Sequence, residues 1–174
     1  MLIYILIGLA ALVVLVLIIA ATRPNTFEVS RSIGIKAPPE KIFPLINDFH
    51  AWPAWSPWEK LEPTMTRTHS GAATGKGAVY AWDGKKVGSG RMEITDTKAP
   101  SMIAIKLDFF KPFEAHNTTV YTMERKGDAT NVNWAMSGNH NFMSKVMCLF
   151  VTMDKMVGKD FEAGLANMKA VAEK

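Results

Sequence analysis

The stretch RSIGIKAPPEKIFPLINDFHAWPAWSPW, residues 31–58, joins a predicted strand to a predicted helix and then to a tryptophan-rich connector. The strand is FEVSRSIGIK, in which alternate positions are apolar, as on one face of a half-buried strand: Phe27, Val29, Ile33 and Ile35. The helix follows in APPEKIFPLINDF, where a proline lies near the first turn and Glu40 suits the positive end of the helix dipole. Pro44 is expected to keep this helix short or kinked.

The connector is rich in tryptophan and proline. Pro53 and Pro57 each remove a backbone donor and disfavour helical backbone at the preceding residue, so the connector must bend. Trp52, Trp55 and Trp58 are spaced by three, which aligns them roughly on one side of a helical or 3₁₀ turn. Their apolar area, with indole N–H groups that need partners, either closes a core or lines the mouth of a pocket.

Six further segments alternate in polarity between turn signals, and they predict a meander of antiparallel strands: TMTRTHS, GAVYAW, GSGRMEITDT, SMIAIKLDFF, AHNTTVYTMERK and TNVNWAMSG. In two of them the apolar side chains share one face: Ile103, Ile105, Leu107 and Phe109 in one, Val132, Trp134 and Met136 in the other. The predicted sheet therefore has one solvated face and one covered face.

The cover is predicted to be a long amphipathic helix that starts near Asn141. Apolar residues recur there mostly three or four apart: Phe142, Val146, Leu149, Met153, Met156, Phe161, Leu165, Met168 and Val171. Gly158 and Gly164 lie inside this stripe, where each costs ~1 kcal/mol relative to alanine, so a missing side chain must be useful. The absence of a side chain allows either the close approach of another segment or room for a ligand. We expect room at Gly164, so that Gly164→Leu weakens ligand binding more than folding.

The N-terminal segment LIYILIGLAALVVLVLIIAA, Leu2–Ala21, carries no charge. At about 1.5 Å per residue a helix of this length spans ~30 Å, the thickness of a hydrocarbon core. No lysine or arginine precedes the segment, and its apolar run is long for a cleavable signal peptide. We expect an uncleaved single-pass anchor in contact with the bilayer through residues 2–21; the alternative is a cleaved signal, with Ala20 and Ala21 as its small residues.

The chain is divided accordingly into an anchor at 1–22, a tether at 23–26 and one domain at 27–174. All 20 basic and 16 acidic residues follow the anchor, for a net charge of +4. There is no lysine or arginine run and no nucleic-acid signature, so no nucleic-acid partner is predicted and an anionic lipid surface fits this charge better.

The orientation of the anchor is predicted from the basic residues around it. Only the α-amino group precedes the segment, and four basic residues follow closely: Arg23, Arg31, Lys36 and Lys41. By the positive-inside rule the domain is expected to be cytoplasmic. The lone cysteine, Cys148, excludes an internal disulfide framework and is interpreted as a small buried hydrophobe.

Residues 31–58, the turn Gly75-Lys76-Gly77 before AVYAWDG, the strand TNVNWAMSG and the terminal FEAGLANMKAVAE resemble the SRPBCC, or START/Bet v 1-like, superfamily, in its polyketide cyclase and lipid-transport-like branch. The resemblance covers about residues 26–173. It implies an α+β helix-grip fold, with a curved antiparallel sheet of about seven strands around a long C-terminal helix and two short helices after the first strand. It also implies an apolar cavity between the sheet and that helix.

The residues expected to line this cavity are large or sulfur-containing side chains and one small residue: Trp52, Trp55, Trp58, Tyr80, Trp82, Tyr121, Trp134, Met136, Met153, Met156, Phe161 and Gly164. Methionine adapts to irregular ligands, although a methionine stripe also suits a plain core. Tyr80, Trp82 and Tyr121 either donate hydrogen bonds to a ligand head group or are satisfied core aromatics. The tryptophans of the connector are expected to cap one end of the grip, as a gate or as a plug.

Signals of catalysis are sparse. The four histidines have no partner at metal-ligand or triad spacing: His50, His69, His116 and His140. Asp108 would be a base with a raised pKa if it pointed inward, but Lys106 shares its face and favours the solvent side. No catalytic residue, metal ligand or cofactor is assigned.

Three functions remain open at this stage. The preferred one is a membrane-tethered module that binds a lipid or another small hydrophobic ligand. The second is a cyclase-like or hydrolase-like enzyme acting on such a ligand, which needs an acid and a base inside the grip. The third is a regulatory module, since the superfamily includes chaperone co-activators; it would expose Trp52, Trp55 and Trp58, and no protein partner can be named.

Overall fold

The computed structural model describes residues 1–140 and 142–174. Its helical elements are α1 (Leu2–Ala21), α2 (Pro39–Asn47), the 3₁₀ turns η1 (Phe49–Ala54) and η2 (Trp58–Lys60), α3 (Phe142–Met147) and α4 (Met153–Ala172). Its strands are β1 (Thr26–Ile35), β2 (Thr66–Gly71), β3 (Ala78–Gly84), β4 (Gly88–Lys98), β5 (Met102–Lys111), β6 (Ala115–Lys126) and β7 (Ala129–Asn139).

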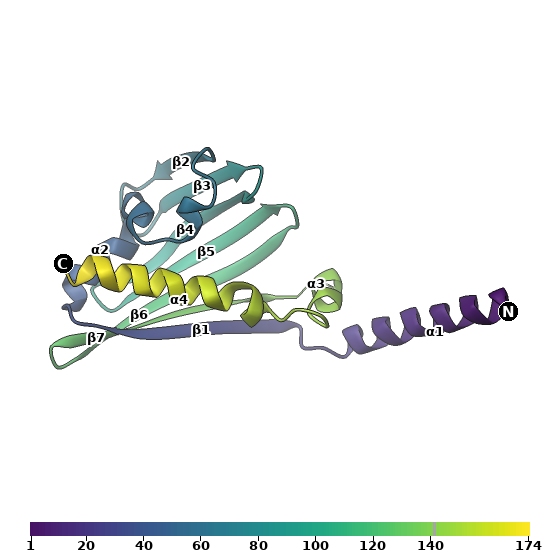
Figure 1. Ribbon diagram of the computed structural model, residues 1–174. Coiled ribbons are helices and arrows are strands. Elements are labelled where there is room, and N and C mark those ends of the chain that lie inside the picture. The colour runs from purple at the N-terminus through teal and green to yellow at the C-terminus, as the bar shows by residue number, and fades with distance from the viewer. Residues whose placement is uncertain (141) are drawn as a thin grey trace.

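The seven strands form one antiparallel sheet in the order β1-β7-β6-β5-β4-β3-β2. Strands β2 to β7 are a meander, and the first strand closes beside the last because β1 pairs with β7 along its whole length. The sheet curves around α4, which lies across its inner face, and α2 with η1 and η2 closes one side (Figure 1). The predicted α+β helix-grip fold is confirmed, including the short helices after the first strand.

The core follows from the alternation of the strands. Ile103 and Ile105 of β5 and Val132 of β7 are fully buried on the inner face, as the apolar pattern predicts. α4 covers them with one stripe, in which Phe161, Leu165 and Met168 are the largest buried side chains. Burying a side chain of this size stabilises the fold by roughly 1.5–3 kcal/mol.

The C-terminal helix differs from the prediction because it does not begin near residue 141. Asn141 itself lies outside the described residues. The helical segment divides into α3 and α4, and Thr152 starts α4 as its N-cap, since its backbone is extended and its side chain accepts a hydrogen bond from the Lys155 N–H. Residues 142–152 are therefore not part of the helix that covers the sheet, and Phe142 of the predicted stripe is half exposed.

One end of the sheet lies close to α1. The register places the start of β1, the end of β7, the β5–β6 turn and the β3–β4 turn at this end, which we call the anchor end. α1 continues away from it and α3 lies between α1 and the sheet (Figure 1). α1 is long and apolar enough to cross a membrane, with a mean hydropathy of 3.3.

Candidate functional site: the interior of the helix grip

The candidate site is the space between the sheet and α4, and Trp134 of β7 lies at its centre. Phe161 of α4 stacks on the Trp134 ring, with centroids 4.1 Å apart and planes 8° from parallel. Trp55 and Trp58 meet the same ring edge-on, at 5.8 Å and 5.6 Å. Such offset and edge contacts between aromatic rings are favourable beyond the area that they bury. Trp134 thus contacts three other predicted site residues.

The tryptophan connector is held in place from α2. Trp52 donates from its indole Nε1 to the Ile46 carbonyl at 3.1 Å, and Trp55 donates to the Leu45 carbonyl at 2.8 Å. These two carbonyls belong to the last turn of α2, where helical partners are missing, so each bond satisfies a donor and an acceptor together. Trp52 and Trp55 are buried and Trp58 is partly buried. The connector therefore packs into the domain and does not present all three rings to solvent.

Two other predicted donors are already satisfied. Tyr80 donates its hydroxyl to Glu59 at 2.5 Å, and Arg67 donates to the other oxygen of the same carboxylate at 2.7 Å. Burial, followed by the hydrogen bond to Glu59, raises the pKa of Tyr80 well above its usual range. Trp82 donates to the Val87 carbonyl at 3.4 Å.

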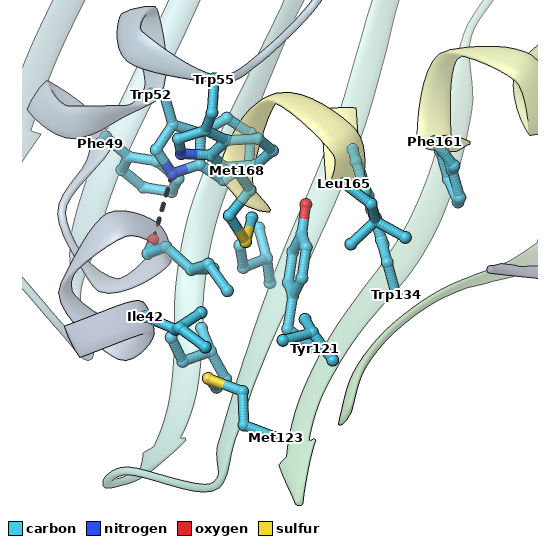
Figure 2. Packing of buried hydrophobic residues seen from close by; sticks show 14 of the residues in the cluster. Ile42, Phe49, Trp52, Trp55, Tyr121, Met123, Trp134, Phe161, Leu165 and Met168 are labelled. Atoms are coloured by element: carbon cyan, nitrogen blue, oxygen red, sulfur yellow. Dashed lines mark hydrogen bonds between the residues drawn. The ribbon is translucent and has the colours of Figure 1, made fainter. Parts of the chain in front are cut away.

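Two donors inside the grip have no partner among residues 1–140 and 142–174. The Tyr121 hydroxyl and the Trp134 indole Nε1 are buried side-chain atoms that make no hydrogen bond to this described part of the chain. Tyr121 is fully buried, and burial raises the pKa of its phenol well above the usual range, so the hydroxyl keeps its proton. Figure 2 shows this hydroxyl pointing away from the sheet toward α4, between Leu165 and Met168. An unsatisfied buried polar group costs about 1–3 kcal/mol.

The methionines of the predicted site divide into two groups. Met136 is buried beside Trp134 on β7, and Met153 packs partly against the core. Met156 is 42% exposed, because it lies off the stripe through which α4 contacts the sheet. It does not line the interior, contrary to the expectation from the methionine pattern. Met168 is fully buried in the core cluster and joins the interior instead.

The two glycines of α4 make room for side chains. A Cβ at Gly164 would lie 2.9 Å from Cζ3 of Trp134 and 3.3 Å from Cδ of Pro57, so a larger residue has no free space there. The expected open room above Gly164 is taken by the Trp134 ring. Gly158 lies under the guanidinium of Arg31, which donates to Asp154 at 2.8 Å and so holds α4 to β1.

The grip is closed by its own side chains in this state. Two surface hollows lie at the anchor end: one beside the β3–β4 turn and Lys111, the other between Glu114, His116 and His140. Neither is lined by a side chain of the grip interior. A ligand would have to separate α4 or the connector from the sheet and replace contacts that the protein makes with itself.

Ionisable side chains of the sheet are paired with each other. Asp108 lies on the outer face with Lys106, as the shared face predicted, and it accepts a hydrogen bond from His116 at 2.7 Å. Burial alone would raise the pKa of Asp108, but the hydrogen bonds from His116 and Lys106 outweigh burial and lower it. A base with a raised pKa is therefore not found at this position.

Sequence reasoning missed the buried carboxylate of Glu59. This residue is 8% exposed and joins Tyr80 to Arg67 across the edge of the grip. No periodic signal could have found it, because Glu59 follows Trp58 in a 3₁₀ turn whose orientation depends on packing. Arg31 was noted for its charge alone, and its contact with Gly158 joins segments more than a hundred residues apart.

Comparisons with known proteins agree with this geometry. Residues 26–173 match the family described as polyketide cyclase / dehydrase and lipid transport. Among the similar solved structures is the Aha1 dimer from Colwellia psychrerythraea, with a TM-score of 0.58 and 17% identity over 84% of this chain and 96% of that one. Ara h 8.0201 has a TM-score of 0.58 and 10% identity over 84% of this chain and 97% of that one. BexL, the di-domain ARO/CYC of the BE-7585A biosynthetic pathway, has a TM-score of 0.61 and 14% identity over 90% of this chain and 53% of that one. No match was found among curated proteins.

Proposed function

The chain belongs to the family described as polyketide cyclase / dehydrase and lipid transport, and on this premise we propose that it is a membrane-tethered module which binds a lipid or another small hydrophobic ligand between the sheet and α4. Membership confirms the resemblance of the chain to the SRPBCC superfamily. The finer claim, a tethered module with its ligand in the grip, is the proposal.

The observation that carries the proposal is the pair of unpartnered donors in an apolar interior. Tyr121 and Trp134 are directly opposite each other on β6 and β7, with ring centroids 4.9 Å apart, and each leaves one N–H or O–H unused. Buried polar groups in proteins are nearly always satisfied, so an unused pair calls for an explanation. A ligand with an apolar body and one carbonyl, ester or hydroxyl oxygen would supply the missing acceptor.

The walls of the grip suit the apolar body of such a ligand. Met136 and Met168 are flexible side chains that refit to irregular shapes, and they lie on opposite walls of the interior. A ligand that enters the grip must open the stack of Phe161 on Trp134, and an apolar ligand would replace that contact with another apolar contact. Ligand binding therefore exchanges one set of packing contacts for another while it satisfies the two donors.

The tether is supported by α1. Its 20 residues have no charge, and apart from Ala20 none of them is buried in the domain. A helix with apolar side chains on every side is stable in a bilayer, where water is absent. We propose a single-pass anchor with the domain on the cytoplasmic side, because the basic residues follow the helix.

The two alternative functions have less support. A cyclase-like or hydrolase-like reaction needs an acid and a base that face the ligand, and the pairs Glu59–Arg67 and Asp108–His116 satisfy each other. A regulatory module that docks through the connector needs exposed tryptophans, whereas Trp52 and Trp55 are buried.

The proposal is tested by photo-crosslinking the full chain in lipid vesicles with a diazirine-bearing fatty acid methyl ester. Peptide mass spectrometry should find adducts on inward-facing residues of β6, β7 and α4. An unlabelled ester of the same length should compete with the photoreactive ester and reduce these adducts. Adducts confined to α1 and to the outer surface of the domain would refute a ligand site inside the grip.

A further inference from the structure

Exposed apolar side chains of the domain gather at the anchor end. After α1, nine large hydrophobic side chains of the described residues are exposed. Seven of them belong to the end of β5 and the β5–β6 turn or to α3 and the segment that follows it: Phe110, Phe113, Phe142, Met143, Met147, Phe150 and Val151. Phe150 is the most exposed, at 76%. Clusters of this kind on a soluble domain mark an interaction site, whereas single exposed side chains are ordinary.

The two groups are neighbours in space. Glu114 of the β5–β6 turn and Ala115 at the start of β6 border the same surface hollow as Asn139 and His140, which lead into α3. Both groups therefore lie at the end of the sheet where β1 begins.

The chain fastens this end to α1. Only residues 22–25 separate α1 from β1, and four residues span at most about 14 Å. Asn25 is held at two of its oxygens, because its backbone carbonyl accepts from the His140 N–H at 2.7 Å and its side-chain oxygen accepts from Lys145 of α3 at 2.5 Å. Ala20 in the last turn of α1 is fully buried. The C-terminal end of α1 is thus held next to α3.

The composition of this end suits the boundary between headgroups and acyl chains. Residues 22–25, 83–88 and 111–114 at this end hold four basic and two acidic side chains: Arg23, Lys85, Lys86 and Lys111 against Asp83 and Glu114. Segments that lie in a bilayer interface combine apolar side chains pointing into the acyl region with lysine and arginine at the headgroups. The positive excess also matches an anionic leaflet.

We propose that the anchor end of the domain is a second membrane-contact surface, in which α3, residues 148–151 and the β5–β6 turn lie in the headgroup region of the bilayer that α1 crosses. The proposal rests on the tether proposed above. It holds the domain in one orientation, with the N-terminal end of α4 facing the lipid.

The test uses the full chain in vesicles of phosphatidylcholine with a minor share of phosphatidylglycerol. In a Cys148→Ser background, single cysteines at Phe113 or Phe150 carry an environment-sensitive fluorophore. The matched controls are cysteines at Asp128, in the exposed turn at the opposite end of the sheet, and at Leu12, in the middle of α1. Each is quenched by aqueous iodide or by nitroxides placed at known depths on the lipid.

We expect the labels at Phe113 and Phe150 to be quenched at least about fivefold more strongly by a headgroup or shallow nitroxide than the label at Asp128, and to be shielded from iodide. If they are open to iodide while Leu12 is quenched by a deep nitroxide, the contact surface is refuted and the tether stands. If they are shielded from iodide but untouched by any nitroxide, protein covers them and the surface is refuted as well. A Leu12 label open to iodide refutes the tether itself, and the membrane-contact surface with it.

Discussion

Replacing Tyr121 by phenylalanine removes one oxygen atom from the interior of the grip and leaves the ring in place. In the free protein that oxygen has no hydrogen-bond partner in the part of the chain that the structure describes, so its removal should stabilise the fold. In the complex the same hydroxyl is proposed to donate to the ligand, so its removal should weaken binding. Opposite effects on folding and on binding are the signature of a group kept for a ligand.

The size of both effects follows from the burial of the group. An unsatisfied buried hydroxyl destabilises the fold by about 1–3 kcal/mol. Removing the oxygen leaves a void of ~10–15 Å³, which at ~24 cal/mol per Å³ destabilises the fold by only about 0.3 kcal/mol. The free energy of unfolding should therefore rise by about 0.7–2.7 kcal/mol, or roughly 1–11 °C in Tm for a domain of this size. Loss of one hydrogen bond should weaken binding of the fatty acid methyl ester about tenfold, which equals ~1.4 kcal/mol.

Both quantities can be measured on the full chain in vesicles. All five tryptophans lie after α1, so their fluorescence during a urea titration reports the unfolding of the domain alone. Binding is measured by competition against the photoreactive ester.

Tyr80→Phe is the matched control, because it removes the same atom from a hydroxyl that has a partner. Loss of the Tyr80 bond leaves Glu59 one donor short, so this variant should lose about 1–3 kcal/mol of stability and keep its affinity for the ester. A Tyr121→Phe protein that is less stable than the parent, or that binds the ester equally well, would refute the assignment of this hydroxyl to a ligand.

Three further outcomes are expected. Gly164→Leu should lower the urea midpoint, since overpacking against Trp134 costs about 1–3 kcal/mol while helix propensity returns at most about 1 kcal/mol; an unchanged midpoint would show free space there. Asp108→Asn should lower the pKa of His116, because the hydrogen bond to Asp108 raises that pKa. The stability that this pair contributes is present below the ordinary histidine pKa and is lost as the pH rises through the raised pKa of His116. An NMR titration in which the pKa of His116 is unchanged by Asp108→Asn would contradict the pairing. The full chain should stay with membranes through carbonate and high-salt washes, because burial of α1 is not screened by salt; release of intact protein would contradict the anchor.

Local periodicity was enough to predict the strands, the short helix after β1 and the apolar N-terminal segment. Each of these elements depends on residues near one another in the chain, such as the alternation through Ile103 and Ile105 or the proline near the start of α2. The resemblance around residues 31–58 then supplied the way in which the elements combine, and the sheet order confirms it.

The same reasoning could not divide the C-terminal stripe or exclude Met156. Apolar residues continue at helical spacing on both sides of Thr152, so the pattern alone carries no sign of the break. The break depends on the N-cap at Thr152 and on where the sheet ends beneath the helix. A helical stripe predicts that a face is buried, but the partner surface decides how many of its turns are covered.

The roles of individual side chains were decided only by the tertiary structure. Tyr80 and Tyr121 have the same chemistry and both face inward, yet one hydroxyl meets Glu59 and the other meets no acceptor. Gly158 and Gly164 are alike in sequence, and the structure places Arg31 over one and Trp134 over the other. Hydrogen-bond satisfaction and close packing depend on atoms brought together from distant parts of the chain, so strand register and the seating of α4 determine them, whereas the elements themselves follow from neighbouring residues.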